Sequence, residues 1–226
     1  MKTIGLIGGT SWHSTIEYYR LINDLVGKEI GSQGNPELII YSVNIELMRE
    51  QNKEKIYSKY LEVSQKLEHA GAKAIVICAN TPHMVYNYVQ PKINIPILHI
   101  ADATGKKAKK KGLNKLGLLG NRPTMTGDFI PNILQVNYDI QTFIPEIKHI
   151  NVAHNHVSKE LTQGHFTSEA KQFFIQQIEL LVQKGADGII LGCTELPLLV
   201  TQEEVNIPLL ATTELHAQMA VDFILS

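Results

Sequence analysis

Cysteine is scarce in this chain: its 226 residues contain only two, Cys78 and Cys193. Two cysteines in a chain of this length form no disulfide framework, and they favour a reduced, intracellular protein. An excess of one charge is also lacking, because 21 basic and 22 acidic residues leave a net charge of −1. That balance provides no general attraction to nucleic acid or to an acidic membrane surface.

Long apolar runs are missing too. No stretch approaches the roughly 18 consecutive apolar residues that span a bilayer. The first residues, Met1–Ile4, run directly into an apolar segment with a glycine turn and do not have the pattern of a secretory signal. We therefore expect a cytoplasmic protein with no membrane partner.

Several motifs of common enzyme classes are absent. Gly5, Gly8 and Gly9 do not form the G-x-G-x-x-G pattern of a dinucleotide site. The G-x-S-x-G motif of serine hydrolases is not found. There is no C-x-x-C pair, and His154 and His156, two residues apart, would face different ways on a helix. The sequence therefore predicts neither an organic cofactor nor a metal.

The most informative stretch that is present covers residues 188–197. Its Ile-Ile-Leu run is typical of a strand buried in a parallel sheet. Cys193 follows at the carboxyl end of this run, where open α/β sheets bind ligands. Thr194 and Glu195 add polar groups, and Pro197 suits the first turn of a helix. A thiol placed there can serve as acid, base or nucleophile, so we predict that Cys193 is functional and not a buried structural cysteine.

An internal repeat indicates how the chain is divided. Residues 71–83 align without a gap with residues 185–197, and residues 3–9 align with residues 115–121. Apolar runs alternate with helical patterns, which favours parallel sheets with right-handed crossovers. We predict an α/β fold of two pseudo-symmetric domains, each a parallel sheet flanked by helices, formed by residues 1–100 with 208–226 and by residues 101–207. The alignment pairs Cys193 with Ala79 and not with Cys78.

Two helices carry local signals. The spacing of apolar residues predicts a helix over Ser14–Val26, with Ser14 as its N-cap and Gly27 as its stop. A second helix over Ala101–Lys111 ends in five lysines. Those lysines suit the negative end of the helix dipole, and we interpret them as a solvated helix end and not as a polyanion site.

Several motifs resemble the aspartate/glutamate racemase family. They are Ile4-Gly5-Leu6-Ile7-Gly8-Gly9-Thr10-Ser11-Trp12, Asn80-Thr81-Pro82-His83, His99-Ile100-Ala101-Asp102-Ala103 and Gly192-Cys193-Thr194-Glu195. The resemblance covers the whole chain. It implies two pseudo-symmetric α/β domains with the active site in the cleft between them, and racemisation of a small amino acid or related carboxylic acid without pyridoxal phosphate or metal. It also implies a homodimer.

Racemisation requires a base on one face of the substrate Cα and an acid on the other. The resemblance implies Cys193 as one of these groups, and the equivalent position in the first half is Ala79, which cannot carry a proton. Successive strand side chains point to opposite faces, so we expect Cys78 to point away. A positioned acid or base contributes roughly 10²–10⁴-fold. We therefore expect weak or altered racemase activity.

The resemblance also implies a set of substrate contacts. Asn80, Thr81 and Thr194 are expected to hold the substrate carboxylate and amine. Gln51 or Asn52 falls where the family places a side-chain contact, and Ala211 stands where a relative would show aspartate. His165 is only a candidate for a side-chain carboxylate, so the substrate side chain stays open. The expected substrate-binding residues are Thr10, Asn52, Ala79, Asn80, Thr81, Thr194 and Glu195.

Other functions remain open from the residues alone. A one-cysteine isomerase or lyase acting on a small carboxylic acid needs only Cys193, which suits Ala79. A cysteine hydrolase would use His83 or His216 as the base for Cys193. A non-catalytic amino-acid binder would need no reactive thiol.

Overall fold

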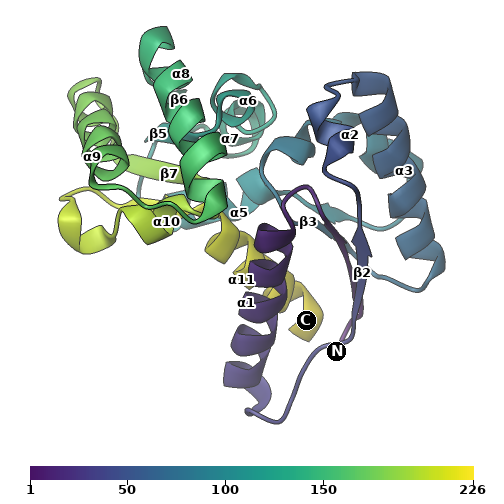
Figure 1. The fold of residues 1–226 in the computed structure, drawn as a ribbon. Helices are drawn as coiled ribbons and strands as arrows, with labels where there is room; N and C mark the ends of the chain where they lie inside the picture. The colour runs from purple at the N-terminus through teal and green to yellow at the C-terminus, as the bar shows by residue number, and fades with distance from the viewer. The chain divides into compact units, whose positions relative to one another are not determined.

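Two parallel sheets of four strands each organise the chain (Figure 1). The structure, a computed structural model, describes all residues from Met1 to Ser226. The strands are β1 Ile4–Gly8, β2 Leu38–Ser42, β3 Ile75–Ile77, β4 Ile97–Leu98, β5 Lys115–Gly120, β6 Gln141–Phe143, β7 Gly188–Gly192 and β8 Leu209–Ala211. The first sheet has the order β2-β1-β3-β4 and the second the order β6-β5-β7-β8.

The helices follow the strands in the alternation that the sequence predicts. They are α1 Trp12–Ile30, α2 Glu46–Arg49, α3 Lys53–His69, α4 Tyr86–Val89, α5 Ile100–Lys110, α6 Arg122–Thr126, α7 Pro131–Tyr138, α8 Ile147–Asn155, α9 Ser168–Gln183, α10 Leu196–Leu199 and α11 Thr212–Leu225. Short 3-10 segments occupy Thr81–Val85, Gln90–Lys92, Leu161–Gln163 and Gln202–Glu204, and a π-helical turn occupies His156–Glu160. No helix combines the length and the apolar character needed to cross a bilayer.

The chain divides into two compact units, one formed by Met1–His99 with His216–Ser226 and the other by Ile100–Leu215. The sequence predicts that residues 208–215 belong to the first domain. They belong to the second unit, because β8 pairs in parallel with β7, with Leu209 opposite Ile189. The boundary near the C-terminus falls inside α11, a position that no local sequence signal marks.

Strand register shows that the two sheets are built alike. In the first sheet Ile75 pairs with both Gly5 and Ile97. In the second sheet Ile189 has the corresponding partners, Gly117 and Leu209. Counting forward from these two isoleucines, residue 79 is equivalent to residue 193. The register therefore supports the gap-free alignment that pairs Ala79 with Cys193.

Each face of the first sheet packs against its own helices. Ile4, Leu6 and Val76 join α1 and the C-terminal part of α11 in one apolar cluster (Figure 1). Ile7 and Ile77 point the other way and pack against α3 and α4. The alternation follows from the two-residue period of a strand.

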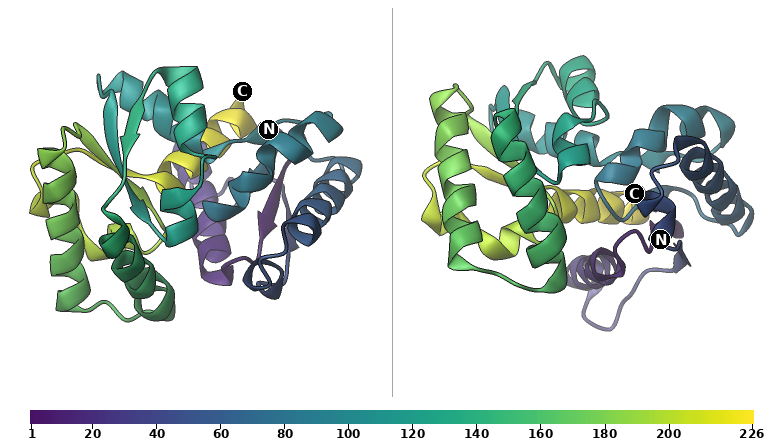
Figure 2. Two further views of the ribbon diagram at one scale, coloured as in Figure 1. Left: turned by 90° about the horizontal axis from the view of Figure 1, so that it is seen from above. Right: turned by 45° about the horizontal axis from the view of Figure 1, so that its top comes forward.

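The second sheet is covered on both faces as well. Ile189 and Leu191 of β7 pack with α8 and α9, which lie side by side (Figure 2). Ile190 faces the opposite way, toward α5 and α7. Cys193 continues the first set and packs against the α8–α9 cluster.

The ends of some helices differ from the expected ones. Ser11 caps α1 by accepting a hydrogen bond from the Ser14 amide, and α1 continues past Gly27 to Ile30. Ser14 is instead buried and donates its hydroxyl to the Cys78 carbonyl. A glycine inside a long amphipathic helix is tolerated when packing of the apolar face outweighs its local cost of about 1 kcal/mol.

One exact duplication escaped the sequence analysis. Residues 90–98 and 202–210 share the pattern Gln-x-x-x-Asn-Ile-Pro-x-Leu. In each unit the glutamine side chain closes the edge strand. Gln90 accepts from the Ile97 amide at 2.6 Å and donates to the Ile95 carbonyl at 3.2 Å. Gln202 makes the equivalent bonds to Leu209 and Ile207 at 3.0 and 2.9 Å. The amides thereby occupy backbone groups that an edge strand otherwise leaves open to other chains.

A buried aromatic cluster of three histidines lies in the first unit. The rings of His83 and His99 are 4.7 Å apart and those of His83 and His216 are 5.3 Å apart. His216 Nε2 lies 2.6 Å from the Leu98 carbonyl, and its Nδ1 lies 2.8 Å from the Tyr18 hydroxyl. Each of the three histidines is 0 or 1% exposed. Burial lowers the pKa to about 4 for His83, about 2 for His99 and about 3 for His216.

We predict that removing the glutamine clamp destabilises the first unit. Gln90→Leu leaves the partly buried Ile97 amide without its acceptor, and we expect the free energy of unfolding to fall by about 1–3 kcal/mol. Urea unfolding followed by circular dichroism measures the change. Gln65→Leu, on the exposed side of α3, is the matched control and should change stability by less than about 0.5 kcal/mol. Equal losses in both variants would argue against the clamp.

We also predict acid lability from the histidine cluster. The unfolded chain binds a proton on each histidine below its ordinary pKa of about 6.5, whereas the folded cluster binds none until about pH 4 or lower. Unfolding therefore takes up protons in this window, and stability falls as the pH falls. At pH 5 the cost is about 2 kcal/mol per histidine, which for three approaches the whole stability of a typical domain.

The slope of unfolding free energy against pH between 6.5 and 4 tests this. His99→Phe should reduce the slope by about one proton, whatever it does to stability at pH 7. His13→Gln, on the exposed surface of α1, serves as the control. An unchanged slope in His99→Phe would contradict the explanation.

Candidate functional site

The turn after β1 approaches the end of β2 closely. Gly9 has φ of 90°, and a Cβ there would lie 2.0 Å from the Val43 carbonyl oxygen. The Gly9 amide donates to Thr15 Oγ1 at 2.9 Å, which ties the turn to α1. Only glycine fits this position, and the turn places the partly exposed Thr10 at the carboxyl edge of the sheet.

A tight turn follows β3 at the same edge. The Cys78 amide continues the sheet by donating to the Ile7 carbonyl, and the next amide, that of Ala79, donates back to the Ile77 carbonyl at 2.9 Å. His83 Nδ1 lies 2.9 Å from the Ala79 carbonyl oxygen, so a protonated Nδ1 donates to it. The turn presents Ala79, Asn80 and Thr81 in sequence.

Cys78 is part of the core. Its side chain is 1% exposed and packs with β1, α1 and α11. Burial raises the pKa of the Cys78 thiol above its ordinary value. The expectation that Cys78 points away from the strand end is confirmed, and the thiol is not available to replace a group at position 79.

Asn52 has a structural role, because it caps a helix. Its Oδ1 accepts from the Lys55 amide at 3.1 Å, which makes it the N-cap of α3. The preceding residue, Gln51, has a left-handed backbone with φ of 53°. Such a conformation is uncommon for a residue other than glycine and often marks a functional turn.

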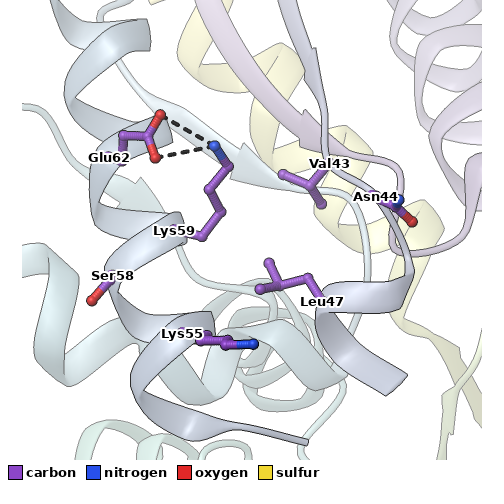
Figure 3. A pocket seen from close by; sticks show the side chains of 7 residues that line it. All are labelled: Val43, Asn44, Leu47, Lys55, Ser58, Lys59 and Glu62. Atoms are coloured by element: carbon purple, nitrogen blue, oxygen red, sulfur yellow. Dashed lines mark hydrogen bonds and ion pairs between the residues drawn. The ribbon is translucent and has the colours of Figure 1, made fainter. Parts of the chain in front are cut away.

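A hollow of about 400 Å³ lies beyond the end of β2, between α2 and α3 (Figure 3). Val43 and Leu47 form its apolar part, and Lys55 and Lys59 extend along it. Both ammonium groups are already paired: Lys55 with Glu50 at 2.7 Å and Lys59 with Glu62 at 3.0 Å. The hollow therefore has no unpaired lysine with which to select an anionic ligand.

The second unit presents Cys193 directly after β7. The thiol donates a hydrogen bond to Glu195 Oε2, with sulfur and oxygen 2.6 Å apart. Burial raises the pKa of the Cys193 thiol well above its ordinary value, the negative charge of Glu195 raises it further, and backbone amides of Glu195 and Leu196 oppose the rise. At neutral pH the group is a thiol whose proton is already directed at a carboxylate.

Two glycines let the strand ends beside Cys193 approach closely. Gly120 of β5 pairs with Gly192 of β7. A Cβ on Gly192 would meet the Leu119 carbonyl oxygen at 2.8 Å and the Thr124 methyl group at 3.0 Å. The missing side chains make room for Thr124, which is fully buried against both strand ends.

A group of polar residues at the end of β5 was missed by the sequence analysis. Arg122 Nε donates to Asn151 Oδ1 at 3.0 Å, and the Arg122 amide lies 3.4 Å from His154 Nδ1. Arg122 comes two residues after Gly120, the partner of Gly192 in the sheet. The sequence feature that could have identified Arg122 is its position directly after a buried strand. His156, in contrast, pairs with Glu160 at 3.0 Å, so His154 and His156 have different partners.

Two further positions named from the sequence, His165 and Ala211, lie in other elements than Arg122 and Cys193. His165 is exposed in the loop before α9, and its amide donates to the Glu160 carbonyl. Ala211 ends β8 and is partly exposed. Thr212, the next residue, is buried and donates to the Leu191 carbonyl at 3.0 Å.

Comparison with known proteins gives a consistent result. The family model described as Asp/Glu/hydantoin racemase matches residues 7–220. The broad specificity amino-acid racemase RacX of Bacillus subtilis strain 168 is 24% identical to this chain over 223 residues, which cover 96% of either protein.

Solved structures agree in fold. A candidate Asp/Glu racemase from Yersinia pestis is 36% identical with a TM-score of 0.94, and an aspartate racemase homologue from Pyrococcus horikoshii OT3 is 32% identical with a TM-score of 0.89. Each alignment covers the whole of both chains. The aspartate racemase of Picrophilus torridus, at 20% identity and a TM-score of 0.76, shares the fold. With matched motifs, duplicated sheets and a family match over nearly its whole length, this chain belongs to the Asp/Glu/hydantoin racemase family.

Proposed function

We propose that this protein is a cofactor-independent amino-acid racemase or a one-base derivative of one, in which Cys193 exchanges a proton with the substrate Cα. Family membership supports the reaction class. The observation that carries the role of Cys193 is its hydrogen bond to Glu195 at the carboxyl end of a central strand. The substrate is a small amino acid or a related carboxylic acid.

The pair can act in both directions. As an acid, the Cys193 thiol gives its proton to the Cα carbanion. As a base, Cys193 first passes that proton to Glu195, and the thiolate then takes the Cα proton. A thiol with a raised pKa yields a more basic thiolate, which is useful against a weakly acidic C–H bond, and amides of Glu195 and Leu196 stabilise its charge.

The first unit lacks a matching proton carrier. Ala79 occupies the equivalent strand end, and Cys78 is buried in the core. Of these two equivalent positions, only Cys193 has a side chain that can transfer a proton. Exchange of the Cα proton should be faster than inversion, because inversion needs a second acid.

The polar groups near the strand ends supply candidates for binding. Asn80, Thr81 and Thr194 are proposed to hold the substrate carboxylate and amine, with Thr10 and Asn52 as further contacts. Arg122 adds a guanidinium held by Asn151, and it is proposed to attract a carboxylate.

The alternative function of a cysteine hydrolase has less support than the racemase. The hydrogen-bond partner of Cys193 is a carboxylate and not an imidazole. His83 and His216 are fully buried: His83 Nδ1 lies against the Ala79 carbonyl, and the two nitrogens of His216 lie against the Leu98 carbonyl and the Tyr18 hydroxyl. Neither histidine offers an exposed nitrogen for use as a general base.

The reactivity of Cys193 can be tested by alkylation. We predict that iodoacetamide modifies Cys193 in the folded protein with a pH midpoint above that of a free thiol, and that Glu195→Gln moves the midpoint to lower pH by removing the negative charge. In a Cys78→Ala variant, mass spectrometry measures alkylation of Cys193 alone. An unchanged midpoint in Glu195→Gln, or preferential labelling of Cys78 in the wild type, would remove the basis of the proposal.

The consequence of Ala79 can be tested in deuterated water with single enantiomers of common amino acids. We expect wild-type protein to exchange the Cα hydrogen faster than it inverts the centre, measured by proton NMR and chiral chromatography. Ala79→Cys or Ala79→Thr should raise inversion roughly ten- to several-thousand-fold, below the full general acid–base range because the pocket was not built around the new group.

Two further variants complete this test. Cys193→Ala should abolish both exchange and inversion, while Cys78→Ala should alter them little. Wild-type inversion at an ordinary turnover, on the order of 10 per second, would show that another group is the second acid.

A further inference from the structure

A second hollow of about 400 Å³ lies along β8, the edge strand of the second sheet. It is bounded by the end of α5, by the segment after α10 and by the start of α11, all within residues 100–215. A volume of this size suits a small molecule. Nothing in the proposed chemistry of Cys193 uses it.

The lysines at the end of α5 are not equivalent. Lys109 Nζ donates to Asn114 Oδ1 at 2.6 Å. Lys107 and Lys111 instead line the hollow. Lys111 directly follows α5, and its amide donates to the Lys107 carbonyl at 3.1 Å, which keeps the two residues one helical turn apart. Neither of them forms a salt bridge, and neither does Glu214, the acidic residue that lines the same hollow. Two cations and one anion thus border the space without protein partners of opposite charge.

The rest of the lining is mainly apolar. Leu191 and Ala211 belong to the strands, and Pro197 and Val200 come from α10 and its end. Gln202 also borders the space, but its amide is held by the clamp on β8. The hollow therefore offers an apolar surface with charges of both signs around it.

We propose that this hollow binds a free α-amino acid with an apolar side chain. The carboxylate pairs with Lys107 and Lys111, the ammonium group pairs with Glu214, and the side chain lies on Leu209 and Ala211, the partly exposed residues of β8. Charges of both signs favour an amphoteric ligand over a simple anion.

The ligand acts as an effector of Cys193. Leu191 precedes Cys193 by two residues and packs in the same apolar cluster. Pro197 follows Glu195, the hydrogen-bond partner of the thiol, by two residues. An occupant therefore contacts the chain on both sides of the Cys193–Glu195 pair and restrains it, which slows alkylation of the thiol. This effector role rests on the proposed function, whereas the binding site does not.

Isothermal titration of the full chain with L-leucine tests the site. We expect Lys107→Gln/Lys111→Gln to weaken binding at least tenfold. Lys106→Gln/Lys110→Gln is the matched control, because it removes the same charge from the same helix at exposed positions outside the hollow. Glu214→Gln should weaken binding of L-leucine but not of 4-methylvalerate, which lacks the ammonium group.

Equal losses in the two lysine pairs, or no binding by the wild type, would overturn the site. The rate of Cys193 alkylation, measured in the same chains, tests the effector role. We expect L-leucine to slow it at least twofold in the wild type and in Lys106→Gln/Lys110→Gln, but not in Lys107→Gln/Lys111→Gln. Slowing that persists in Lys107→Gln/Lys111→Gln would place the leucine at another site, and binding without slowing would refute the effector role. Racemase assays enter none of these measurements, so the proposed function can fail independently.

Discussion

Parallel pairing of the central strands is the constraint on which the site depends. β1 with β3, and β5 with β7, bring the carboxyl ends of each pair to one sheet edge. In the second unit this pairing needs Gly120 and Gly192, because a side chain at either position would meet a backbone oxygen of the neighbouring strand. The residue after this close approach is Cys193, so the thiol follows a strand that is packed on both faces.

The two units use one scaffold for different local chemistry. Where the second unit has a thiol directed at a carboxylate, the first has an alanine above a cluster of neutral histidines. His83 contacts the Ala79 carbonyl and is itself buried beside His99 and His216. The equivalent strand end thus carries a turn held by a buried histidine in the first unit and a hydrogen-bonded thiol, the proposed proton carrier, in the second. The duplication extends to the glutamine clamps, which close the free edge of β4 and of β8 in the same way.

The two units also differ in which buried groups have shifted pKa values. Burial and, to a lesser extent, the charge of Glu195 raise the pKa of the Cys193 thiol, and burial lowers the pKa of each of the three histidines. The first effect concerns the group that we propose to react, and the second concerns histidines that are buried without charge in the core. A lowered or raised pKa therefore does not by itself identify a catalytic group in this protein. The geometry around each group separates the two cases.

Sequence alone determined the fold class, the alternation of strands and helices, the equivalence of Ala79 with Cys193 and the direction of the Cys78 side chain. These features follow from apolar periodicity within segments and from a gap-free repeat between the two halves, and both can be read directly from the sequence. Only the tertiary structure decided that β8 belongs with the second sheet, that Ser14 holds the Cys78 carbonyl and not the start of α1, and that Glu195 accepts a hydrogen bond from the Cys193 thiol. It also brought together His83, His99 and His216, which are separated by up to 133 positions between 83 and 216. Contacts of this kind depend on which strands pair and on how the side chains of turns and loops are oriented, and neither is encoded in the periodicity of a single segment.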